Sequence, residues 1–178
     1  MPESLTSPNV DNYYIGKGIV SIKKPGDVDY VDVGNVPEFE YTPDLAKLDH
    51  FTSRTGIRSK DKSIVLEKSA QLRMVMEEWT ARNLALMLMS VPDETNPAAV
   101  TMDILSEGSI TCAVKFVGQN DVGPKWTFEF PRVEFTPSGS LNVISDDDWS
   151  GIEITGDILV DLVSGKFGTA TADLSGAS

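Results

Sequence analysis

Cysteine and histidine are almost absent from this chain of 178 residues, which contains one of each. Cys112 has no second cysteine with which to form an internal disulfide, so the fold must be stabilised by packing or by association. His50 alone excludes metal sites that need two or three imidazoles. We expect Cys112 to be a small buried apolar residue, and His50 to lie in a loop or an interface.

Long apolar runs are missing as well. The longest, LALMLM at residues 84–89, is much shorter than the roughly 20 residues of a membrane-spanning helix. The N-terminal sequence MPESLTSPNVDNYY contains acids and no apolar segment, so it does not resemble a signal peptide. We therefore expect a protein with no membrane anchoring that folds in the cytoplasm.

Positive charge is scarce. The chain has 15 lysine and arginine residues against 27 aspartate and glutamate residues, a net charge of -12. Because proteins bind nucleic acids by neutralising phosphates with basic side chains, this composition argues against gripping DNA or RNA over a broad surface. A hydrophobic content of 40% with 24% charged residues is typical of a globular protein, and the length favours a single domain.

Motifs for catalysis are missing too. The sequence has no GxxxxGK(S/T) phosphate loop, no GxGxxG after a strand and no GxSxG nucleophile elbow. Three consecutive aspartates at 146–148 could bind Ca²⁺ or Mg²⁺, but they cannot all reach one ion unaided, so a solvated loop is the favoured interpretation. We expect no enzyme, no cofactor and no metal site.

What the sequence does contain is a pattern of β-strands. Between turns rich in Gly, Pro, Asn and Asp, apolar and polar residues alternate over several runs. In one run, Leu72, Met74 and Met76 fall on one face while Gln71 and Arg73 fall on the other. Strands are predicted at residues 13–24, 30–42, 63–78, 108–118, 125–137, 138–145 and 151–172.

One segment, about residues 80–90, is predicted to be helical. Thr80 is a plausible N-cap, Leu84 and Leu88 recur at helical spacing, and Pro92 follows. The sum is a mainly β protein, a β-sandwich or barrel with one flanking helix. We place the single domain at residues 12–172, between a flexible N-terminal arm (1–11) and a flexible C-terminal tail (173–178).

Residues 44–69 interrupt the β pattern. No steady period is present up to residue 63, so we predict a long loop here, and long loops in compact domains are normally functional. The segment HFTSRTGIRSKDKS (50–63) has four basic residues and one acid, and residues 44–82 carry a net charge of +2 in this acidic chain. Such an uneven charge favours head-to-tail association between identical copies.

The order of three motifs points to a family. YYIGKGIVSI is followed by DVGNVPEFEYTPD and then by LDHFTSRTGIRSKDKSIVLEKSAQLRMVMEEWTARNLALMLM. Over roughly residues 12–90 this progression resembles the major tail tube proteins of long-tailed bacteriophages with flexible tails, the siphovirus type. The rest of the chain agrees with that family mainly in length and β content.

The resemblance implies a structural virion protein. Proteins of that family are β-sandwiches with a flanking helix; six copies form a ring in which the sheets join into a β-barrel around a channel. Stacked rings make the tail tube through which the DNA genome passes, with only transient and non-specific contact. The implied partners are further copies of the chain, the tape measure protein, the tail tip or initiator complex and the tail terminator.

The resemblance also implies roles for particular residues. The long loop of residues 44–69 would contact a neighbouring subunit or ring, through His50, Phe51, Arg54, Ile57, Arg58, Lys60 and Lys62. Polar residues on the strand faces are candidates for an acidic channel wall that repels phosphates. These candidates are Gln71, Arg73, Glu77, Thr127, Glu129, Glu153 and Thr155.

Two alternatives stay open. The tube component of a contractile injection machine is similar in fold to the phage tail tube protein. A soluble β-sandwich that binds a glycan or a protein could use Trp79, Trp126 and Trp149, although aromatic residues on β faces usually belong to the core.

Overall fold

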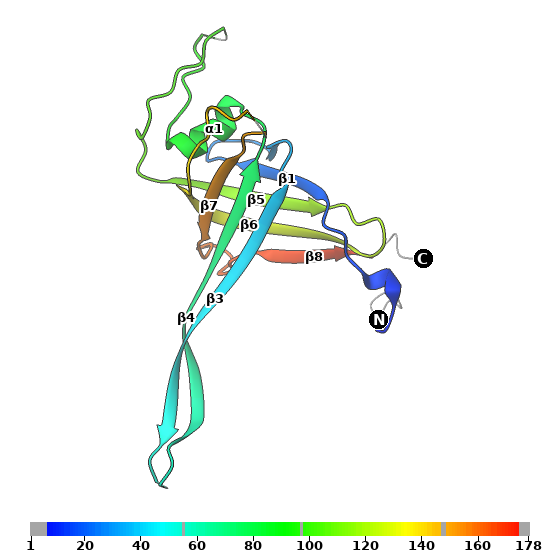
Figure 1. The fold of residues 1–178 in the computed structure, drawn as a ribbon, viewed down its shortest axis with the longest axis vertical. Coiled ribbons are helices and arrows are strands. Elements are labelled where there is room, and N and C mark those ends of the chain that lie inside the picture. Colours follow the sequence, from blue (N-terminus) through cyan, green and yellow to red (C-terminus); the bar gives the residue numbers. More distant parts are fainter. Residues whose placement is uncertain (1–6, 55, 97, 147–148, 175–178) are drawn as a thin grey trace.

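The computed structural model describes residues 7–54, 56–96, 98–146 and 149–174 (Figure 1). These residues form one antiparallel sheet, one α-helix, α1 (Ala81–Leu88), and a short 3-10 turn, η2 (Val10–Asn12). The strands are β1 (Gly18–Lys23), β2 (Val31–Asp32), β3 (Glu38–Thr52), β4 (Ser59–Met76), β5 (Ile110–Gly118), β6 (Lys125–Pro137), β7 (Ile152–Ile158) and β8 (Thr169–Asp173). The prediction of a mainly β fold with one helix is therefore confirmed.

The sheet has the strand order β2-β1-β5-β6-β7-β4-β3, and β8 pairs with β6 outside this path. β6 is shared, because its first half pairs with β8 and its second half with β7. Between these halves Pro131 and Arg132 lie opposite Ala113 alone, which makes a β-bulge. Such a bulge bends the strand that carries it.

The bent sheet curls so that β3 faces β5 and β6. Phe39 of β3 stacks on Phe116 of β5 with ring centroids 5.4 Å apart, and Tyr41 stacks on Phe130 of β6 at 5.8 Å. One curled, open sheet thus provides the two layers that the sequence predicted as a sandwich or barrel.

The core lies on the inner face of this curled sheet. The alternation predicted for β4 is confirmed, since Leu72, Met74 and Met76 are buried there. Cys112 is 2% exposed, and this burial raises the pKa of its thiol to about 11. Other apolar residues of this core include Val114, Phe130, Val133, Phe135, Ile152 and Ile154.

Helix α1 packs against β6 and β7 at one end of the sheet. The Thr80 hydroxyl accepts a hydrogen bond from the Asn83 N–H at 3.1 Å, as an N-cap does. Asn83 is itself buried and donates to the Val33 carbonyl at 2.8 Å, which ties the helix to the segment after β2. The helix ends when Met89 adopts a left-handed conformation (φ 49°), so it stops before Pro92 is reached.

Four predictions need correction. The strand predicted at residues 30–42 is two strands, β2 and the start of β3, with no strand at residues 33–37. Residues 44–69 are not a loop but most of a two-stranded hairpin, because β3 and β4 pair up to Thr52 and Ser59. Residues 138–145 contain no strand; both edges of the adjacent β7 are already paired, with β6 and β4. The predicted strand at 151–172 is two strands, β7 and β8, separated by a turn in which the Gly165 N–H donates to the Asp161 carbonyl at 2.8 Å.

The predicted N-terminal arm is only partly described. Residues 1–6, 175–178 and the aspartates at 147 and 148 lie outside the described residues. The chain is fixed just after the arm, where Asn120 donates to the Tyr13 carbonyl at 2.9 Å and accepts from the Ile15 N–H at 3.2 Å. The chain at Tyr13 and Ile15 is therefore held against the turn between β5 and β6.

Candidate functional site

The most prominent feature of the molecule is the β3–β4 hairpin, which projects from the body (Figure 1). Pairing between β4 and β7 covers only Gln71–Met76, whereas β3 and β4 continue together to the tip. From Pro43 to Thr52, at about 3.3 Å per residue, the ribbon extends by roughly 30 Å. Register shifts at Ala46/Lys47 and His50/Phe51 interrupt its ladder.

Apolar side chains are exposed along both faces of this hairpin. Ile57 at the tip is 82% exposed, and the cross-strand neighbours Leu48 and Ile64 are about half exposed. Apolar surface of this extent is uncommon on a protein that works as a monomer and is typical of an interaction surface. The large apolar side chains exposed on the hairpin are Leu45, Leu48, Phe51, Ile57, Ile64, Val65 and Leu66.

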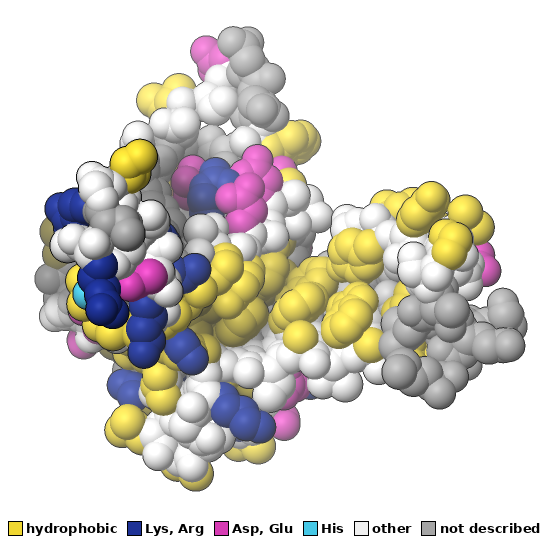
Figure 2. Space-filling view, turned by 90° about the horizontal axis from the view of Figure 1, so that it is seen from below, with side chains coloured by type: hydrophobic (Ala, Val, Ile, Leu, Met, Phe, Trp, Pro, Cys, Tyr) yellow, Lys and Arg dark blue, Asp and Glu magenta, His cyan; other side chains and the backbone are white. Residues whose placement is uncertain are grey.

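Basic side chains gather at the tip of the hairpin, as Figure 2 shows in dark blue. The guanidinium of Arg58 lies 5.8 Å from the centroid of the Phe51 ring, a cation–π arrangement. His50 Nδ1 is 2.6 Å from Asp61 Oδ1. The structure thus brings together the predicted contact residues His50, Phe51, Arg54, Ile57, Arg58, Lys60 and Lys62, on two strands and a turn rather than on a loop.

The Asp49 carboxylate organises one side of the ribbon. Lys60 Nζ lies 2.8 Å from Asp49 Oδ1 across the strands. Hydrogen bonds from the side chains of Lys60 and Ser63 lower the pKa of Asp49, because they favour its charged form. The carboxylate therefore stays ionised and holds the two strands together near the tip.

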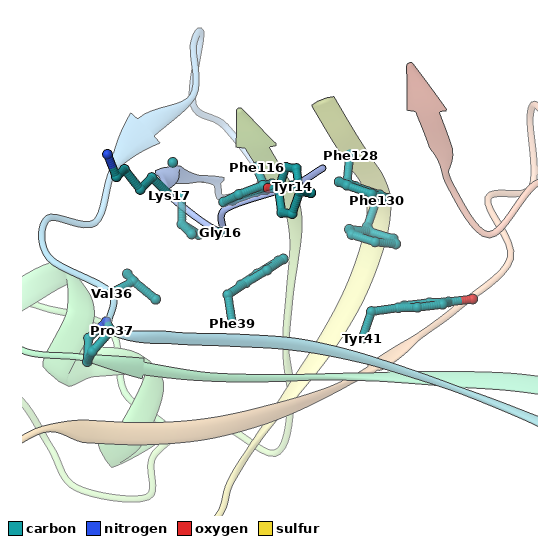
Figure 3. Close-up of a pocket in the computed structure, with 12 residues that line it drawn as sticks. Tyr14, Gly16, Lys17, Val36, Pro37, Phe39, Tyr41, Phe116, Phe128 and Phe130 are labelled. Carbon is teal, nitrogen blue, oxygen red and sulfur yellow. The ribbon is translucent and has the colours of Figure 1, made fainter. Parts of the chain in front are cut away.

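A groove lined by aromatic rings opens between the two layers of the curled sheet (Figure 3). One cavity in it has a volume of about 320 Å³, and more open depressions of about 410 Å³ at Trp126 and about 200 Å³ at Phe167 share aromatic residues with it. In Figure 2 hydrophobic side chains form a band across the same face of the molecule that carries the hairpin. The aromatic groove comprises Tyr14, Phe39, Tyr41, Phe116, Trp126, Phe128, Phe130 and Phe167.

An acidic cluster lies on the opposite, outer face of the sheet. Arg73 Nε donates to Glu153 Oε1 at 2.8 Å, and its Nη1 pairs with Glu38 and lies 3.6 Å from Glu40 Oε2. These hydrogen bonds, to Glu153 first and then Glu38, raise the pKa of Arg73. One arginine thus faces three carboxylates, so the cluster remains acidic.

The structure brings together four of the predicted channel-wall residues. The strand register places Gln71, Arg73, Glu153 and Thr155 on neighbouring positions of the outer face. Glu38 and Glu40 were missed, although alternation in the sequence EFEYT places both on one face of a strand. The register of β3 with β4 then puts that face beside Arg73.

The other three candidates lie elsewhere. Thr127 and Glu129 are on the first half of β6, between β5 and β8, where Lys115 Nζ is 2.6 Å from Glu129 Oε1. Glu77 follows the end of β4, and its N–H donates to the Asn35 carbonyl at 3.0 Å. Alternation along one strand gives no information on the curl of the sheet, which separates Thr127 and Glu129 from Arg73.

The three tryptophans differ in their exposure and surroundings. Trp79 Nε1 donates to the Ser150 carbonyl at 2.8 Å. Trp149, which precedes Ser150 in the sequence, is 87% exposed. Trp126 belongs to the aromatic groove, with its ring centroid 6.3 Å from that of Phe128.

Within the described part of the chain, no group of three or more His, Cys, Asp and Glu side chains could hold a metal ion. The same residues include no helix of the length and apolar character needed to cross a membrane.

A family model described as "Protein of unknown function UCP028589" matches residues 13–112, more than half of the chain. The matched residues include β1 to β4, with the whole hairpin, and α1. No curated protein matches the chain.

Proposed function

The chain belongs to the family described as "Protein of unknown function UCP028589", and we propose that it is a self-assembling subunit of a bacteriophage tail tube. In this proposal six copies close into a ring, and stacked rings form the tube through which the DNA genome passes. The protein is then a virion component with a structural role rather than an enzyme. The observation that carries the proposal is the projecting hairpin with its exposed apolar and basic side chains.

The hairpin has little to stabilise it within one subunit. An isolated two-stranded ribbon is marginally stable in water, because it buries too little apolar surface to offset its ordering. Here the ribbon beyond Asp44 leaves Leu48, Ile64 and Leu66 about half exposed. Contact with another copy of the chain would cover these side chains, which supports a function in assembly.

The open sheet also supports association. β3 forms one edge over 15 residues, and the short strand β2 lies at the other end of the strand order. Exposed edges present unpaired N–H and C=O groups, and a closed ring of subunits would cover them.

The acidic cluster around Arg73 is our candidate for the channel wall. Three carboxylates on one arginine leave negative charge, and Asp157, held by Gln71 at 3.1 Å, adds to it. Such a surface repels phosphates, so DNA would slide past it without binding. The tape measure protein, the tail tip or initiator complex and the tail terminator are the partners this function requires.

The aromatic groove favours a second candidate, a module that binds a glycan or a protein. Aromatic rings with open faces, such as Trp126 and Tyr41, are common in such sites. A tube component of a contractile injection machine remains a variant of the main proposal, since the two are similar in fold.

Electron microscopy of the concentrated protein tests the proposal. We expect rings and tubes with a central channel, and a single subunit at low concentration in light scattering. A protein that stays monomeric at all concentrations, even with tail tip and tape measure proteins added, would contradict it. In that case binding to a glycan array would support the second candidate.

A further inference from the structure

The loop between α1 and β5 (residues 89–109) projects from the end of the molecule opposite the hairpin (Figure 1). Its base is ordered, since the Leu105 N–H donates to the Leu88 carbonyl at 2.8 Å and the Glu107 N–H to the Met89 carbonyl at 2.9 Å. Ile104 and Leu105 are about two thirds exposed or more. Like the hairpin tip, this loop therefore holds apolar side chains in water.

The loop and the hairpin tip have opposite charge. Residues 89–109 contain four acids and no lysine or arginine, whereas residues 50–63 contain four bases and one acid. The acids of the loop are Asp93, Glu94, Asp103 and Glu107, and all four are exposed. Two projections at opposite ends thus match in both charge and apolar character.

We propose that the α1–β5 loop of one copy binds the hairpin tip of the next copy. This inference rests on the proposed function, and it names the surface that receives the hairpin. Because the two surfaces differ and lie at opposite ends, the contact is head-to-tail and repeats along the long axis of the molecule. Ile104 and Leu105 of the loop would then be covered by Phe51 and Ile57 of the tip.

The aromatic groove is a weaker receptor for the tip. It opens on the same face of the molecule that carries the hairpin, as seen from below in Figure 2. In copies of similar orientation within one ring, the hairpins therefore point away from every groove. The α1–β5 loop lies at the opposite end of the molecule. In the next copy along the long axis, this loop therefore lies in the direction in which the hairpin extends.

A charge-swap experiment tests this contact. The hairpin variant carries Arg54→Glu, Arg58→Glu and Lys62→Glu, and leaves Lys60 in place because it pairs with Asp49. The loop variant carries Glu94→Lys, Asp103→Lys and Glu107→Lys, and leaves Asp93 in place because it accepts a hydrogen bond from the Thr95 N–H. Each variant brings like charges together at the contact, and the combined variant restores opposite charges.

We expect each single set to raise the concentration needed for tube formation at least tenfold, because a small repulsion is repeated around the ring. The combined variant should form tubes near the wild-type concentration, and so should a mixture of the two single sets. Circular dichroism confirms that all variants are folded.

Two failures have different meanings. If wild-type protein forms no rings or tubes, the proposed function is wrong. If wild-type protein forms tubes but the folded combined variant remains as defective as the hairpin variant, the loop is not the partner of the hairpin.

A cross-link provides a second measurement that needs no charge change. Ile57→Cys and Ile104→Cys chains are mixed in assembled tubes and oxidised; native Cys112 is buried and does not compete. We expect disulfide-linked pairs that contain one chain of each kind. Ala170 lies beside Phe167 in the aromatic groove, so Ala170→Cys is the matched groove variant. If Ile57→Cys forms pairs with Ala170→Cys and not with Ile104→Cys, the proposal is overturned.

Discussion

The two halves of β4 differ in burial. From Gln71 to Met76 the strand lies between β3 and β7, and every second side chain is buried. From Ser59 to Ser69 the same strand pairs only with β3, and every residue is exposed. The segment that ends at Met76 is stabilised within one chain. The segment from Ser59 to Ser69 has exposed apolar side chains that only another molecule could cover.

The largest effect is expected from truncation of apolar side chains, compared between the core of the sheet and the distal hairpin. Phe135 is 1% exposed, so Phe135→Ala should lower the free energy of unfolding by about 3–5 kcal/mol. Leu48→Ala on the hairpin, where the side chain is 54% exposed, should change it by less than about 0.5 kcal/mol. Urea unfolding of the unassembled subunit, followed by circular dichroism, measures both. Equal losses would mean that the hairpin already packs on the body of a single subunit.

A smaller effect is expected from adding one methyl group to a glycine. A Cβ on Gly156 would lie 2.4 Å from Val133 Cγ1 and 2.9 Å from Phe135 Cδ1, so Gly156→Ala should cost about 1–3 kcal/mol. A Cβ on Gly56 at the hairpin tip would meet nothing within 4 Å, so Gly56→Ala is the matched control and should not destabilise the subunit. Thermal unfolding compares the two, and an undisturbed Gly156→Ala variant would contradict the tight contact between β7 and β6.

The smallest effect concerns pH and the hairpin alone. The pKa of Asp49 is lowered in the folded chain from its ordinary 3.8. The ionised carboxylate therefore stabilises the hairpin fully above that pH, and this stabilisation is lost as the pH falls through the lowered pKa. Nuclear magnetic resonance of the subunit should show cross-strand contacts between Asp49 and Ser63 weakening at low pH. In Asp49→Asn this pH dependence should be absent. The same dependence in the variant would mean that another group causes it.

Sequence patterns predicted the parts of the fold in which one face is buried. Met74 and Met76 gave a clear alternation because they point into the core, and Thr80 marked the start of α1 by its capping chemistry. The distal hairpin was predicted as a loop because alternation reports burial, and both faces of this ribbon are exposed. Strand pairing, which does define the hairpin, has no sequence period of its own.

The candidate site was predictable to a similar degree. The basic character of Arg54, Arg58 and Lys62 is visible in the sequence without any structure. The aromatic groove was not predictable, because it depends on the curl that brings Tyr41 opposite Phe130. Assembly into rings is a prediction that the experiments above test, whereas passage of DNA and location in the virion stay predictions.

The interruptions in β3 also limit what can pair with its open edge. A long flat edge strand accepts almost any extended chain, which leads to fibrils. β3 instead contains Pro43, which has no N–H to donate, and register shifts after Ala46 and His50. Its backbone groups therefore do not form an even row, and a random extended peptide cannot follow them for 15 residues. The kinks make the edge selective, so that unrelated extended chains pair with it poorly and it stays available for a partner of matching shape.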